Sequence, residues 1–166
     1  MNIDMDKLLT SLENLYEAEN KVVEIITNTG IRFSPNKMTG DLGEFYVFYH
    51  FSKRKDLFET LYCSNVSNGE FDLFGMLSKD SVLNQHFPYL DRLRIEVKTR
   101  RNQTGPKYLS AVKPDQFDLL CVVDMAQNYL LNSIFLVTGE IVEKHWDKKR
   151  QRLVFREEMA FLSYSY

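Results

Sequence analysis

The clearest pattern along the chain is an alternation of polar and apolar residues between positions 92 and 100. Successive side chains of a β-strand point to opposite faces of the sheet, so this pattern predicts an amphipathic strand. One face would carry Leu93, Ile95, Val97 and Thr99, and the other Arg92, Arg94, Glu96, Lys98 and Arg100. The alternation therefore places Glu96 and Lys98 on the same, more polar face.

Two earlier segments show the period of helices. In residues 4 to 27 the apolar positions are mostly three, four or seven apart, which predicts an amphipathic helix within an N-terminal segment of residues 1 to 30 that ends at Gly30. Its apolar stripe could pack on the sheet or on a second copy of the chain. A second helix is predicted over residues 39 to 61, with Thr39 or Asp41 as its cap.

The rest of the chain alternates between strands and helices. Short or buried strands are predicted at residues 69 to 77, 117 to 125 and 130 to 137, a helical turn at Pro114, and a helix at residues 139 to 151. Residues 152 to 166 could form a final strand or an extended cover. We therefore expect one α/β domain of residues 1 to 166, in which a central mixed β-sheet is flanked by α-helices.

Composition narrows the class of protein. No apolar run approaches the 18 residues of a membrane span, and the N-terminus has no signal-like pattern. Cys63 and Cys121 match no zinc spacing, so we expect buried or free thiols and a cytoplasmic protein without membrane contact. The net charge of −2 excludes a strongly basic, indiscriminate polyanion binder. A local basic patch remains, made of Lys98, Arg100, Arg101 and Lys107.

An acidic residue followed two positions later by lysine occurs three times, at residues 19 to 21, 96 to 98 and 147 to 149. Only the middle triplet lies on a predicted strand, where Glu96 and Lys98 would be roughly 6.6 Å apart along one face. A carboxylate at that spacing can bind a divalent cation while the ammonium orients a water or neutralises a phosphoryl oxygen. Asp72 is the natural second ligand, with Asp80 as a possible substitute.

Four segments follow one another along the chain: GDLGEF with Glu44, FDLFG with Asp72, IEVKTRR with Glu96 and Lys98, and the buried run FDLLCVVDM. Over residues 35 to 145 this order resembles the PD-(D/E)XK, or restriction-endonuclease-like, nuclease superfamily. The resemblance implies a restriction-endonuclease-like fold and a Mg²⁺-dependent (or Mn²⁺-dependent) endodeoxyribonuclease. It also implies roles: Asp72, Glu96 and the carbonyl of Val97 would bind the metal, Lys98 would position or activate the attacking water, and Glu44 would complete the metal site.

Several residues have both a functional and a structural interpretation. Glu44 shares a helix face with Phe48 and Phe51, and could instead cap its helix or pair with Arg54. Thr99, Arg100 and Arg101 could contact phosphates or form a solvated strand end. Gln116 could lie near the scissile strand or act as a helix cap.

The sequence therefore predicts a metal-dependent DNA endonuclease that hydrolyses phosphodiester bonds. A homodimer, joined through the N-terminal helix, would allow two sites to cut two strands. Two alternatives stay open: a nuclease-like module that binds DNA or protein without cleaving, and a small interaction or immunity protein. His50, His86 and His145 lie in unrelated settings, and we assign them no role. The chain has no glycine-rich phosphate loop and no serine nucleophile elbow, which argues against a nucleotide triphosphatase and a serine hydrolase. We also expect no small organic cofactor.

Overall fold

The computed structural model describes residues 4–27, 36–64, 71–102 and 108–166. Its centre is a six-stranded mixed sheet with the strand order β1-β2-β3-β5-β6-β9. These strands are β1 (Phe58–Cys63), β2 (Leu73–Leu77), β3 (Arg92–Arg101), β5 (Leu119–Met125), β6 (Leu131–Thr138) and β9 (Leu162–Ser165). Within this sheet β3 and β5 run parallel and the other neighbours are antiparallel. The predicted α/β class with a mixed central sheet is confirmed.

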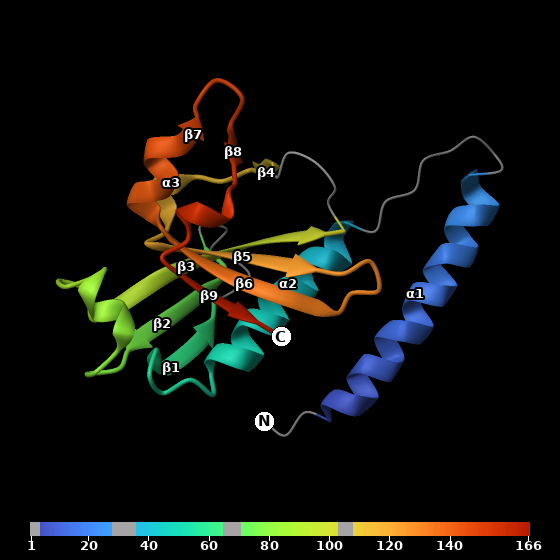
Figure 1. The fold of residues 1–166 in the computed structure, drawn as a ribbon, viewed down its shortest axis with the longest axis horizontal. Coiled ribbons are helices and arrows are strands. Elements are labelled where there is room, and N and C mark those ends of the chain that lie inside the picture. The colour runs from blue at the N-terminus through green and yellow to red at the C-terminus, as the bar shows by residue number, and fades with distance from the viewer. Residues whose placement is uncertain (1–3, 28–35, 65–70, 103–107) are drawn as a thin grey trace.

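Two layers cover this sheet (Figure 1). One face packs against α2 (Asn36–Phe51) and α1 (Met5–Thr27), whose Leu12 belongs to the same buried cluster. The other face is covered by α3 (Gly139–His145) and a small sheet of order β4-β8-β7, made of β4 (Tyr108–Ser110), β8 (Arg152–Val154) and β7 (Trp146–Asp147). Short 3₁₀ turns lie at η1 (Val82–Gln85), η2 (Pro114–Gln116) and η3 (Glu157–Met159). Each side of the sheet therefore has its own apolar core.

The prediction for the second helix was wrong at both ends. The helix begins at Asn36, so Thr39 and Asp41 lie inside it, and it ends at Phe51. Residues 52–57 then turn back, with Arg54 paired to Asp56 at 2.5 Å. The apolar residues that continued the helical spacing belong to β1, where hydrogen bonding to β2 and burial stabilise a strand instead.

Other boundaries also differ from the prediction. The helix expected over residues 139 to 151 ends at His145, because Trp146 and Asp147 pair with β8. The strand expected from residue 69 begins at Leu73, and residues 69 and 70 lie outside the described parts of the chain, as do Gly30 and Lys107. The tail does end in a strand, β9, on the sheet edge.

The N-terminal helix packs on its own chain. Leu12 is 4% exposed, and Met5, Leu8 and Tyr16 pack against the core shared with α2. A charged cluster adds to this contact, because Arg101 of β3 donates two hydrogen bonds to Glu19 of α1, at 2.9 and 3.1 Å. No helix in the described ranges is both long and apolar enough to cross a bilayer.

Candidate active site

The candidate site lies where β2 and β3 separate. Their pairing runs as far as Leu73 opposite Ile95, and the Asp72 N–H donates to the Ile95 carbonyl at 3.0 Å. Beyond Ile95 the next hydrogen bond on this side of β3 goes to a side chain and not to the β2 backbone: the Asp72 Oδ2 accepts a hydrogen bond from the Val97 N–H at 2.7 Å. The N–H and C=O of one strand residue point to the same side, so the Val97 carbonyl faces the side of Asp72.

A cavity of about 320 Å³ opens at this point. Seven side chains line it: Phe71, Asp72, Glu96, Lys98, Ala111, Lys113 and Gln116. Three of the four predicted catalytic residues are thus brought together on one wall. Ala111, Lys113 and Gln116 come from the segment between β4 and β5 and complete the lining. The predicted Gln116 therefore lies at the site, and Lys113 joins it as a second cation that the sequence pattern did not indicate.

The carboxyl groups of Asp72 and Glu96 in this cavity are partly desolvated. Burial raises the pKa of Asp72, and the Val97 N–H and the Lys98 charge offset this only in part. Burial also raises the pKa of Glu96, although the Lys98 Nζ lies 2.5 Å from its Oε1 and Lys113 adds positive charge. The wall therefore holds two acids close together, an arrangement that a bound cation would stabilise.

Glu44 lies near this wall without lining the cavity. It belongs to α2, and burial, followed by repulsion from Asp72, Asp41 and Glu96, raises its pKa to about 7. The helix reaches β3 because the preceding residue is glycine: a Cβ at Gly43 would lie 1.8 Å from the Thr99 hydroxyl oxygen. Arg54, the alternative partner suggested for Glu44, is paired with Asp56 instead.

The residues at this wall suit a hard divalent cation. Mg²⁺ commonly binds proteins through one or two carboxylates and keeps several waters. Asp72, Glu96 and the Val97 carbonyl offer such oxygen ligands. Across the described ranges, no group of three or more His, Cys, Asp or Glu side chains is arranged to hold a metal. Glu44 is thus not gathered with Asp72 and Glu96 into a three-carboxylate cluster.

The structure turns the three residues after Lys98 inward, away from the role expected for them. Arg100 is 1% exposed, and its Nε donates to Asp124 at 2.9 Å. Arg101 is held by Glu19, and the Thr99 hydroxyl is buried beside Gly43. The alternation predicted a solvated face for Arg100, but the small sheet and η3 cover that face. These three side chains are therefore not free to bind phosphates in this structure.

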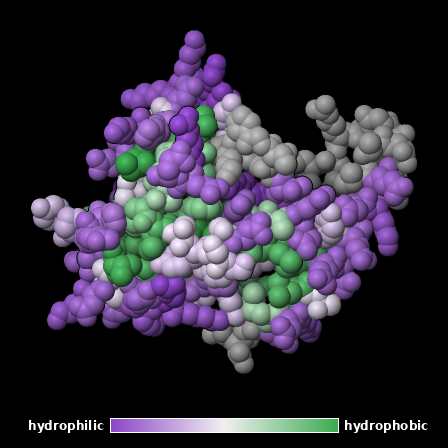
Figure 2. Space-filling model, viewed as in Figure 1, coloured by the Kyte–Doolittle hydropathy of each residue, from purple (hydrophilic) through white to green (hydrophobic). Residues whose placement is uncertain are grey.

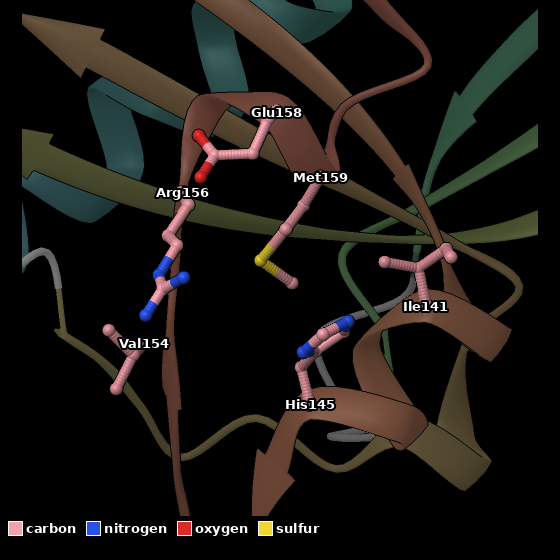
Figure 3. Close-up of a pocket in the computed structure, with 6 residues that line it drawn as sticks. All are labelled: Ile141, His145, Val154, Arg156, Glu158 and Met159. Carbon is pink, nitrogen blue, oxygen red and sulfur yellow. The ribbon is translucent and has the colours of Figure 1, made fainter.

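Two further features lie apart from the cavity lined by Asp72, Glu96 and Lys98. Asp80, the substitute ligand, is exposed in the turn after β2, beyond the strand end opposite to Asp72. A second cavity, of about 380 Å³, lies between α3 and the β8–η3 segment and is lined by Ile141, His145, Val154, Arg156, Glu158 and Met159 (Figure 3). Glu158 is the one carboxylate in that lining, so this cavity lacks the pair of carboxylates that lines the candidate site.

Comparison with known proteins adds little to this geometry. No protein-family model matches the sequence, and no curated protein matches it. Among solved structures, a bacterial homing endonuclease, I-Ssp6803I, aligns with 65% of this chain and 72% of its own, at 12% identity and a TM-score of 0.42. A likeness of this size does not establish a shared function.

Proposed function

We propose that this chain is a divalent-metal-dependent DNA endonuclease of the restriction-endonuclease-like type. One observation carries the proposal: Asp72, directly before β2, and Glu96 and Lys98 of β3 line a single cavity at the point where those strands separate. Two acids and a lysine in one cavity are the groups that hydrolysis of a phosphodiester by an activated water requires.

Each residue has a role in this proposal. Asp72, Glu96 and the Val97 carbonyl would hold Mg²⁺ or Mn²⁺. The metal, when bound, supplies a Lewis acid and lowers the pKa of a coordinated water. Lys98 would orient the attacking water and neutralise charge that develops on the phosphoryl oxygens. Glu44, with a pKa of about 7, would take up or release a proton near neutral pH.

Cleavage of duplex DNA would need one such site for each strand. We propose that a second copy of the chain supplies the second site. Because α1 packs on its own chain through Leu12 and Glu19, its exposed side, which includes the 38% exposed Leu15, is the part of that helix left for contact between copies.

A cleavage assay tests the proposal against the alternative of a binding module without activity. Supercoiled, linear and branched DNA would be incubated with the protein in Mg²⁺, in Mn²⁺ and in a chelator. We expect cleavage with either metal, at least a hundredfold loss for Asp72→Asn, and wild-type rates for the matched control Asp80→Asn. Absence of cleavage on every substrate, or equal rates for the two variants, would refute the proposal.

A further inference from the structure

A second charged region lies outside the candidate site. Residues 144–156, here called the basic hairpin, contain six Lys and Arg and a single acid, Asp147. The remainder of the chain carries 15 Lys and Arg against 22 Asp and Glu, so it is acidic. Positive charge is therefore concentrated in thirteen residues of a protein whose net charge is −2.

These cations point outward. The hairpin spans the end of α3, β7, the turn at residues 148–151 and β8. Its exposed cations are Lys144, Lys148, Lys149, Arg150 and Arg156. The Arg150 side chain keeps 65% of its exposure although it pairs with Asp147 at 3.8 Å. In Figure 2 the hairpin projects from the top of the molecule as a strongly hydrophilic tip.

The basic hairpin lies on the side of the central sheet to which the candidate site opens. Glu96 and Lys98 alternate with the buried Val97, whose side chain belongs to the core on the α2 side, so they point to the opposite face. That opposite face is the one covered by α3 and the small sheet. In the small sheet Arg152 is paired with Ser110, and the chain continues from Ser110 through Ala111 and Lys113 along the cavity wall.

We propose that the basic hairpin binds the phosphate backbone of duplex DNA beside the candidate site; this rests on the proposed function. A row of exposed Lys and Arg attracts phosphates without regard to base sequence. Strand spacing places the turn roughly 13 Å or less from Arg152, a reach of a few nucleotides from the cavity wall.

The aromatic residues of this region favour a duplex over a single strand. Proteins that bind single strands stack bases on exposed aromatic rings. In the basic hairpin Phe155 is 1% exposed and Trp146 is only partly exposed. The nearby Tyr108 is 42% exposed, and the Arg152 guanidinium lies over its ring, 4.1 Å from the centroid. The hairpin itself thus presents several exposed cations and no fully exposed Phe, Tyr or Trp ring, which suits contact with the outside of a duplex.

The test measures binding without cleavage. Affinity for a short fluorescent DNA duplex would be followed by anisotropy in a chelator over a series of salt concentrations. In the test variant Lys148, Lys149 and Arg150 are replaced by alanine. The control variant replaces Lys53, Lys55 and Lys79, three exposed cations outside the hairpin, and so changes the net charge equally. Thermal unfolding of both variants confirms that they fold.

We expect the test variant to lose at least about tenfold in affinity and to lower the slope of log K against log salt by about 3, with less than about twofold change in the control. Equal losses in both variants, or unchanged binding in the test variant, would overturn the proposal. The proposal would also be overturned if the wild-type protein bound phosphatidylserine vesicles or an acidic peptide but did not bind DNA. Duplex binding through the hairpin without any cleavage would remove the proposed function and leave this inference standing.

Discussion

Two basic stretches of this chain look alike in sequence and behave differently in the structure. At the end of β3, Arg100 forms an ion pair with Asp124 and Arg101 with Glu19. In the basic hairpin, Lys148, Lys149 and Arg150 face solvent. Arg100 lies under the small sheet and Arg101 lies against α1, while the second stretch forms the outer turn of the small sheet. Whether a basic run can meet a ligand is therefore decided by what covers it, and the density of charge along the sequence does not reveal this.

The largest expected effect comes from removing the most deeply buried of these cations. Arg100→Ala should lower the free energy of unfolding by about 3 kcal/mol, because it leaves Asp124 without its partner and empties space between Phe135 and Phe155. Arg150→Ala, its exposed counterpart, should change stability by less than about 0.5 kcal/mol. Urea unfolding of both variants measures the difference, and similar values would break the contrast between the two stretches.

The second inward-facing arginine holds α1. Glu19→Gln should lower stability by about 2 kcal/mol, since it weakens charge-assisted hydrogen bonds from Arg101 and Tyr129. Burial would raise the pKa of Glu19, but these hydrogen bonds outweigh it and lower the pKa. The stabilisation should therefore be present above pH 4.5 and be lost as the pH falls through the folded-state pKa.

Amide hydrogen exchange would localise this effect. Exchange in α1 should accelerate in Glu19→Gln and stay at the wild-type rate in Glu17→Gln, a change at an exposed position of the same helix. Equal exchange in both variants would show that the Glu19–Arg101 pair does not hold the helix.

Two glycines of α2 differ in how closely they approach β3. Gly43→Ala should lower stability by between roughly 1 and 2 kcal/mol, because the added methyl would overlap the Thr99 hydroxyl. At Gly40 a Cβ would meet nothing within 4 Å, so Gly40→Ala should raise stability by roughly 0.5–1 kcal/mol through helix propensity. Thermal or urea unfolding measures both, and a loss of similar size at the two positions would contradict the close packing of α2 on Thr99.

The smallest expected effect on stability comes from Glu44, whose pKa is raised because burial and nearby acids outweigh the positive charge of Lys98. Between its ordinary pKa of 4.5 and about 7, Glu44 binds more protons in the folded protein than in the unfolded chain. The free energy of unfolding should therefore fall as the pH rises through that range, by roughly 1 kcal/mol once partial solvent exposure is allowed for. Glu44→Gln should remove this dependence and Glu59→Gln, at an exposed position of β1, should keep it. Identical stability profiles against pH for both variants would refute the assignment.

Sequence reasoning succeeded where one strong periodicity dominated. The alternation in β3 and the apolar run of β5 fixed two neighbouring strands, and Asp72 was expected beside them. It failed where tertiary pairing overrode local spacing, as for Phe58 and Leu61 in β1, which continued the period of α2. Strands of two or three residues, such as β7 and β8, show no period at all. Arg100 was misplaced because strand alternation separates two faces but does not say whether a second layer covers the polar one.

Lys113 shows the limit for the site itself. It lies 15 residues after Lys98 in a segment without a recognisable motif. Tertiary contacts bring this segment to the cavity, among them the pairing of β4 with β8 and the hydrogen bonds from Arg94 to Asp115 and Asp118. No local signal could have identified it.

Single-turnover DNA cleavage by Lys98→Ala would show whether the cavity that Lys98 lines is a catalytic site. With enzyme in excess over DNA and with Mg²⁺ present, the rate reports the chemical step rather than binding. We expect Lys98→Ala to lose at least a hundredfold in rate while binding DNA normally, and Lys79→Ala to cleave like the wild type. Equal rates for the two variants would contradict the assignment of catalysis to the cavity formed by Asp72, Glu96 and Lys98.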